Sequence, residues 1–149
     1  MARDHRKLRV FHNAHQLVLA IYRQTKVFPK DEWFGIRLQM RRAATSVPTN
    51  IVEGSARRTT SEYVYFVNVA RGSAGELHYL IDLASELGFL AGEAFKNLNA
   101  RAEHVVRQLE RLIQELETLL AVEREQTRRK RLMKKISGAG PRAHRPEPI

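Results

Sequence analysis

Apolar residues recur every three or four positions over most of the first 120 residues. This spacing places them on one face of an α-helix, and no segment shows the sustained apolar/polar alternation of a β-strand. Four such stretches predict helices over about residues 11–28, 31–53, 61–87 and 95–121. Because short links between long helices make sequential neighbours antiparallel, the predicted fold is an all-α, up-down-up-down four-helix bundle.

Local signals predict where these helices begin and end. Pro29 stops the first helix, and Gly54 is expected just beyond the end of the second. Thr59 and Glu62 have the spacing of a capping box, which starts the third helix. Gly88 is expected to end that helix, because glycine adopts the left-handed backbone conformation that often follows a helix.

Two features interrupt the helical pattern. Pro48 lies inside the second helix, where it removes a backbone donor, so a kink or short break is expected near residues 46–47. Gly72 and Gly75 lie in the middle of the third helix, where each costs roughly 1 kcal/mol relative to alanine. We interpret these glycines as places where another helix approaches the backbone closely.

The fourth helix has the most regular apolar row, formed by Phe95, Leu98, Ala102, Val105, Leu109, Leu112, Leu116 and Leu119. A second row widens this face and favours self-association, and it consists of Val106, Ile113 and Leu120. Beyond Ala121 the pattern fades, so this helix is expected to fray and the last dozen residues to be disordered. The predicted domains are therefore a bundle over residues 1–120 and a basic helix extension with a disordered tail over residues 121–149.

The charge is strongly positive and unevenly distributed. Lys and Arg number 26 against 16 Asp and Glu, a formal charge of +10, and +6 of this lies in residues 121–149. Such a field favours polyanionic partners, nucleic acid first. No apolar run approaches the roughly 20 residues of a membrane span, and the charged N-terminus does not resemble a signal peptide. Without cysteine, the composition suits a reducing compartment, and we expect a cytoplasmic protein with no membrane partner.

Two groups of basic residues are candidates for phosphate contacts, since the planar arginine fork donates paired hydrogen bonds. The first is a belt that would cross the second and third helices, formed by Arg37, Arg41, Arg42, Arg57, Arg58 and Arg71. The second is in the extension and consists of Arg128, Arg129, Lys130 and Arg131. Glu53, Glu62 and Glu76 are spaced to pair with belt arginines, so a structural ion-pair network is an equally good interpretation of the belt.

Catalysis has no support in the sequence. His12 and His15 are spaced to share a helix face, but no HExxH pattern or neighbouring carboxylate accompanies them. The six histidines are interpreted as surface or capping residues, and no metal or cofactor is expected. Serine and cysteine hydrolase patterns are also absent, so the chain is predicted not to be an enzyme.

The segments FPKDEWFGIRLQMRRAATSVPTNIVEG, SEYVYFVNVARGSAGEL and LASELGFL resemble the four-helix-bundle proteins encoded in intervening sequences of bacterial 23S rRNA genes. The resemblance spans about residues 8–120 and implies a ring-forming homo-oligomer, a pentamer, with a nucleic-acid-binding role. Similar bundles are accessory proteins of reverse transcriptases in diversity-generating retroelements. The matching positions outside the arginines are Gln39, Ser46, Pro48, Asn50, Glu53, Gly54, Gly72, Ser73 and Glu76. Among these, Ser46 and Asn50 are expected to satisfy backbone groups that Pro48 frees.

Two functions are therefore weighed. The leading hypothesis is a non-enzymatic nucleic-acid-binding oligomer, with RNA favoured over DNA, that contacts mainly phosphates because few aromatic residues are placed for base stacking. The alternative is an assembly or adaptor protein, such as a reverse-transcriptase accessory subunit, whose surface serves protein contacts. The extension after Ala121 is longer than is usual in the family, so its role is not implied by the resemblance.

Overall fold

The computed structural model describes residues 3–138, and every regular element in that range is helical. The four long helices are α1 (Arg9–Gln24), α2 (Ile36–Ser55), α3 (Thr60–Glu86) and α4 (Gly92–Ser137). Three 3₁₀ turns accompany them, and these are η1 (His5–Lys7), η2 (Thr25–Val27) and η3 (Lys30–Glu32). The prediction of an all-α fold is confirmed.

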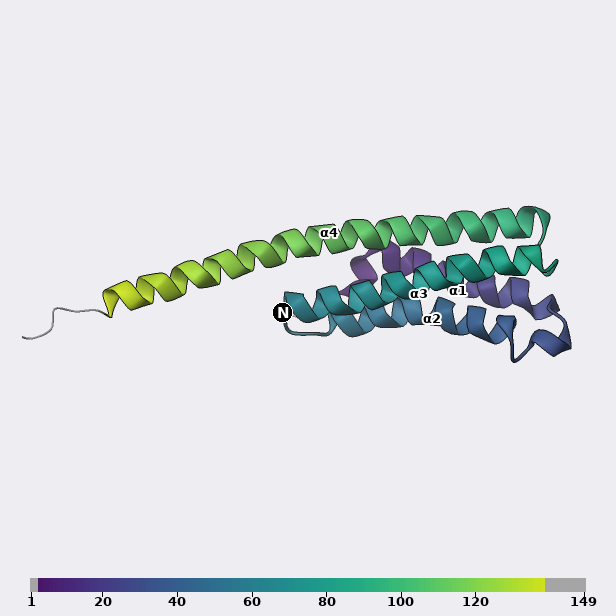
Figure 1. Ribbon diagram of the computed structural model, residues 1–149, viewed down its shortest axis with the longest axis horizontal. Coiled ribbons are helices and arrows are strands. Elements are labelled where there is room, and N and C mark those ends of the chain that lie inside the picture. Colours follow the sequence, from purple (N-terminus) through teal and green to yellow (C-terminus); the bar gives the residue numbers. More distant parts are fainter. Residues whose placement is uncertain (1–2, 139–149) are drawn as a thin grey trace, which may run out of the picture.

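The helices form an antiparallel up-down-up-down bundle, as predicted (Figure 1). α1 packs against α2 and α4, and α3 packs against the same two helices, so each helix covers one side of a shared core. The apolar positions predicted from the periodicity fill this core, with Ile21, Met40, Ile51, Leu77 and Leu109 fully buried. The hydrophobic pattern alone was enough to identify the inward faces.

The ends of α3 are formed by the residues that the sequence indicates. The Thr59 hydroxyl accepts a hydrogen bond from the backbone N–H of Glu62 at 3.2 Å, and the Glu62 carboxylate accepts one from the backbone N–H of Thr59 at 3.3 Å. This is the predicted capping box. At the other end Gly88 has a φ of 80°, the left-handed conformation expected of a helix-terminating glycine.

The capping box makes stability depend on pH. Hydrogen bonds from Thr59, first from its side chain and then from its backbone, hold the pKa of Glu62 below its ordinary value of 4.5. A carboxylate with a lowered pKa stabilises the fold above its unfolded-state pKa, and this contribution is lost as the pH falls through the folded-state pKa. We expect the melting temperature to drop below pH 4.5 by less in Glu62→Gln than in the wild type. Equal drops in thermal melts from pH 6 to pH 3 would contradict this.

The second helix differs from its prediction in three ways. The segment expected to begin it at residues 31–32 forms η3 instead, and α2 starts at Ile36. The chain stays helical through Pro48, so the expected short break at residues 46–47 is wrong, while the kink stays a prediction. Gly54 lies inside α2 and not beyond its end.

The fourth helix is much longer than predicted. It continues to Ser137 without the expected fraying, and residues 121–138 are all exposed. Leu119, expected in the core, is 44% exposed because it lies where the bundle ends. The second apolar row is not surplus, since Ile113 is buried and Val106 packs against the core, so it no longer argues for self-association. The disorder predicted for the end of the chain falls on residues 139–149, which lie outside the described residues.

Candidate nucleic-acid interface

The predicted belt of arginines is divided between opposite sides of the bundle. Arg41 contacts α1, whereas Arg71 contacts α4 through Glu110. Because α1 and α3 do not neighbour each other around the core, these two arginines lie at different helix–helix edges. The expectation of one continuous belt is therefore wrong, and each arginine has to be considered by its own surroundings.

Arg41 holds the end of α1 in place. Its Nε donates to the hydroxyl of Thr25 at 3.0 Å, a second guanidinium nitrogen donates to the carbonyl of Tyr22 at 3.3 Å, and the guanidinium lies 4.4 Å from the Tyr22 ring centre. Thr25 is fully buried and donates in turn to the carbonyl of Ile21 at 2.7 Å. Arg37 lies in a similar way over the ring of Trp33, at 4.7 Å. These contacts are structural.

Arg57 and Arg71 form ion pairs. Arg57 pairs with Glu53 one turn earlier, as the structural interpretation proposed, and lies over the Phe66 ring at 4.8 Å. Arg71 pairs with Glu110 of α4 at 3.3 Å, a partner that sequence spacing did not identify because the two residues lie on different helices. Both pairs are largely solvent-exposed, so each contributes little to stability.

Arg42 and Arg58 differ from the rest of the group. Both are exposed, and neither has an ion pair with a described residue. Glu62, one of the expected partners, caps α3 instead, and Glu76 is exposed without an ion pair in the described part of the chain. Among the belt residues, Arg42 and Arg58 thus have neither an ion pair nor an aromatic contact with a described residue, and their guanidinium groups are available to an outside anion.

The structure brings two separate sequence motifs together. The hydroxyls of Ser46 on α2 and Ser73 on α3 lie 2.7 Å apart, and the Asn50 amide donates both to the Ser46 hydroxyl at 3.0 Å and to the Ser46 carbonyl at 2.7 Å. The carbonyl that Pro48 deprives of its donor is that of Ala44, four residues earlier. The expectation that Ser46 and Asn50 satisfy this group is therefore wrong. The Ser46 hydroxyl instead joins α2 to α3, and Asn50 holds that hydroxyl from within α2. Gln39 is exposed two turns before Ser46 on the same helix.

Gly54, expected only to follow the end of a helix, lies at a close helix–helix contact, whereas Gly72 and Gly75, expected at such a contact, do not. A Cβ atom on Gly54 would lie 2.8 Å from the Cβ of Phe66 and 2.9 Å from the Tyr63 ring, so this position needs glycine for the close packing of α2 on α3. Gly72 and Gly75 have open space where a Cβ would stand, with nothing within 4 Å. Within the described part of the chain, no helix approaches them.

The predicted tail residues lie on different sides of one exposed helix. At 3.6 residues per turn, Arg128 and Arg131 share a side of α4, whereas Arg129 and Lys130 point in other directions. Arg129 pairs with Glu125 at 3.0 Å. Arg124 and Lys135 join the side of Arg128 and Arg131, and sequence analysis did not select them because only a helix that continues past Ala121 aligns them.

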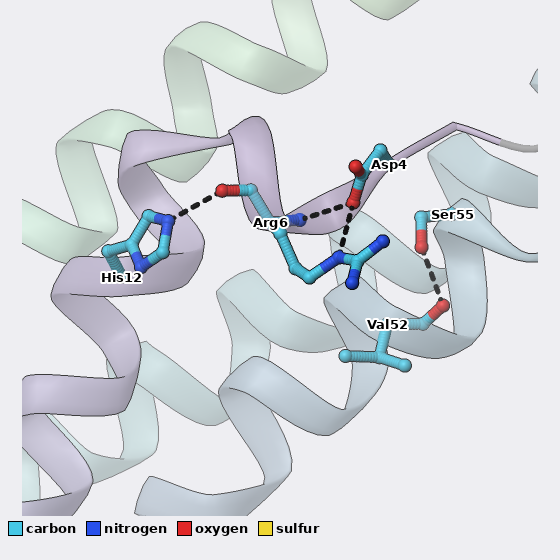
Figure 2. Close-up of polar contacts among 5 residues, drawn as sticks. All are labelled: Asp4, Arg6, His12, Val52 and Ser55. Carbon is cyan, nitrogen blue, oxygen red and sulfur yellow. Dashed lines mark hydrogen bonds and ion pairs between the residues drawn. The ribbon is translucent and has the colours of Figure 1, made fainter.

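The segment that begins at Arg3 is hydrogen-bonded to the same end of the bundle from which α4 extends. Asp4 accepts hydrogen bonds from the backbone and side chain of Arg6, and the Arg6 guanidinium holds the pKa of Asp4 below its ordinary value (Figure 2). The Nε2 of His12 donates to the carbonyl of Arg6 at 2.6 Å. The Ser55 hydroxyl donates to the carbonyl of Val52 at 2.8 Å, close to this segment (Figure 2). His12 therefore ties the segment before α1 to the first turns of that helix.

The described residues hold no group of three or more His, Asp or Glu side chains arranged to bind a metal ion. In the same range, none of the helices has both the length and the apolar character required to cross a membrane. His78, one of the predicted surface histidines, is partly buried, donates to the side-chain oxygen of Asn99 at 2.8 Å and so links α3 to α4.

Comparisons with known proteins agree with this architecture. A family model described as 23S rRNA-intervening sequence protein matches residues 6–111. The chain is also similar to a solved structure, a protein of unknown function from the S23 ribosomal protein family of Bacteroides thetaiotaomicron VPI-5482. The two are 19% identical with a TM-score of 0.65, and the match covers 70% of this chain and 95% of that one, which shows the shared fold. No curated protein matches the chain.

Proposed function

Because the chain belongs to the family of 23S rRNA-intervening sequence proteins, we propose that it is a non-enzymatic, oligomeric, cytoplasmic RNA-binding bundle that contacts mainly phosphates. The observation that carries the proposal is the placement of its free cations. Arg42, Arg58 and most basic residues of α4 beyond Ala121 are exposed and lack ion pairs with the described carboxylates. Exposed cations without protein partners are available to phosphate groups.

The family name favours RNA over DNA as the nucleic acid. Phosphate contacts are favoured over base stacking, because α4 beyond Ala121 contains no aromatic residue. The division into a bundle over residues 1–120 and a basic extension over residues 121–149 stays a prediction. The described helical part of that extension, residues 121–137, is called the arm.

The test is a fluorescence-anisotropy titration of the full chain with a structured RNA and with duplex DNA. Counterion release predicts that affinity falls at least tenfold between about 50 and 200 mM salt, more steeply as more phosphates are contacted. We expect tighter binding to RNA and no cleavage of it. A flat salt response, or no binding at the lower salt concentration, would refute the proposal.

We propose that subunits of the oligomer meet on the outer face of α3. On this face Tyr65 is 64% exposed and Tyr79 is 63% exposed, with the partly exposed Val69 and the open Gly72 between them. These residues recur at helical spacing, so they form one stripe, in which the exposed Glu76 lies between Gly72 and Tyr79. Large exposed apolar side chains beside a flat glycine position are suited to close packing against a helix of a neighbouring subunit. The ring of five subunits remains an expectation from the family.

Replacing Gly72 with leucine is expected to abolish assembly and leave the monomer folded, because its side chain meets nothing in its own subunit but would block a close neighbour. Size-exclusion chromatography with light scattering measures the mass, and circular dichroism measures the helix content. Ala100→Leu, at an exposed position of α4, is the control. An unchanged mass in the Gly72→Leu variant would remove α3 as the interface.

One observation favours the alternative, a protein adaptor such as a reverse-transcriptase accessory subunit. At the turn between α1 and α2, Phe34 is 89% exposed and Val27 is 82% exposed. Large apolar side chains that are exposed together often mark a surface that binds another protein. The adaptor function predicts co-elution with a polymerase encoded beside this chain and loss of co-elution in Phe34→Ser. RNA affinity that survives Phe34→Ser would keep the two functions apart.

A further inference from the structure

The arm (residues 121–137) is an exposed helix that projects past the rest of the bundle (Figure 1). At 1.5 Å per residue it is about 25 Å long. The first turn of the arm is hydrogen-bonded to the bundle. The Thr60 hydroxyl donates to the carboxylate of Glu123 at 2.9 Å, and Arg3 donates to the Thr60 hydroxyl at 2.8 Å. The family match ends at residue 111, so the arm is a feature of this chain beyond the family match.

The arm carries seven Lys and Arg residues and two Glu residues, a net charge of +5. Four of the cations form one line, since Arg124, Arg128, Arg131 and Lys135 recur at intervals of four, three and four residues. On an α-helix these positions fall within about 60° of one another and span about 16 Å. We call this line the cationic stripe. None of its members has an ion pair with a described residue.

The surface beside the stripe is slightly hollowed. One shallow depression is lined by Leu120, Glu123, Arg124, Thr127, Arg128 and Arg131. Arg124, Arg128 and Arg131 of the cationic stripe thus line the same depression. The remaining cations differ in direction or in pairing, because Arg129 binds Glu125, and Lys130 and Lys134 lie on another side of the helix.

We infer that the cationic stripe binds the phosphate backbone of double-helical RNA, an inference that rests on the proposed RNA-binding function. Its cations are about 4.5 to 6 Å apart along a straight helix, and a rigid line of charges matches a rigid duplex better than a flexible single strand. Three of the four are arginines, whose forks donate two hydrogen bonds to one phosphate. The arm has no aromatic residue, so it lacks the stacking surfaces that hold unpaired bases.

The apolar residues of the arm argue against an anionic membrane as the polyanion. Val122, Leu132, Met133 and Ile136 are all exposed and occupy a side centred roughly 125° around the helix from the stripe. Nine residues without an apolar side chain separate Val122 from Leu132, so the apolar side is interrupted over about 15 Å. A helix that lies on a bilayer buries a continuous apolar face, which the arm does not have.

The test compares two double variants that remove equal charge one residue apart. Arg131→Gln with Lys135→Gln removes half of the stripe, and Lys130→Gln with Lys134→Gln removes two unpaired cations from another side. All four positions are exposed, so both variants should fold like the wild type, which circular dichroism checks. Affinity is measured for a blunt RNA duplex, its single strand, a DNA duplex and phosphatidylglycerol vesicles.

We expect the stripe variant to lose at least about tenfold in affinity for the RNA duplex and to reduce the salt slope by about two, while the control loses less than about threefold. Equal losses of affinity in both variants would refute the role of the cationic stripe but not the proposed RNA-binding function. Unchanged affinity in both variants would have the same meaning. Tighter binding to the single strand, to DNA or to vesicles than to the RNA duplex would overturn the choice of ligand. If the wild type binds no RNA, the proposed function itself fails.

Discussion

Replacing Gly54 with alanine is expected to lower the free energy of unfolding by about 2 kcal/mol, although alanine is the better helix former. The new Cβ would lie 2.8 Å from the Cβ of Phe66 and 2.9 Å from the ring of Tyr63. The first of these atoms is next to the α3 backbone and cannot rotate away. α2 and α3 would therefore have to separate, which weakens the packing around fully buried Ile51 and Val67.

The measurement is urea unfolding followed by circular dichroism, at two protein concentrations so that assembly does not obscure the monomer. Gly72→Ala is the matched control, since the same atoms are added inside a helix where nothing lies within 4 Å. This control is expected to stabilise the monomer by up to about 1 kcal/mol. If Gly54→Ala proves as stable as the wild type, the close approach of α2 to α3 is not needed.

Replacing Arg41 with methionine is the second large expected effect, a loss of about 2 kcal/mol of stability. Methionine keeps the apolar stem but removes hydrogen bonds to Thr25 and Tyr22 and the stacking on the Tyr22 ring. The partly buried hydrogen bond to Thr25 contributes about 1.5 kcal/mol, the cation–π contact adds about 0.5 kcal/mol, and the exposed bond to Tyr22 adds little. The turn from α1 into η2 depends on these contacts.

Arg42→Met is the control for Arg41, because the neighbouring residue is exposed and has no ion pair with a described residue. Its stability is expected to change by less than about 0.5 kcal/mol, whereas its RNA affinity falls. Thermal melts and the RNA titration together separate a structural arginine from a binding one. The opposite pattern, with Arg42 needed for stability and Arg41 for binding, would contradict the assignments made from the contacts.

The helices, their inward faces and their caps could be predicted because they depend on residues close together in the chain. The periodic apolar positions identified the core, and the spacing of Thr59 and Glu62 identified a real capping box. The length of α4 was missed because residues 123–131 contain no apolar side chain to continue the row, and the helix there is a continuation of a packed one.

The candidate site was predicted less well. Spacing along the chain suggested Glu53 for Arg57 correctly, but it could not find Glu110 for Arg71 or the Tyr22 ring beneath Arg41, because those partners come from other segments. In the same way, spacing grouped residues 128–131 as one basic run, whereas a continuous helix places Arg128 and Arg131 apart from their neighbours.

By itself, the sequence determined the fold class, the order of the helices, the core positions and the excess of positive charge, all of which follow from local periodicity and composition. Only the tertiary structure decided which glycine lies against a neighbouring helix and which has open space beside it. It also decided which arginines bind other residues of the chain and which are exposed without an ion pair. The reason is geometric. Whether a side chain has a partner depends on how closely two helices pack, and those helices can be far apart in sequence. The spacing of residues along one helix gives no information about that distance.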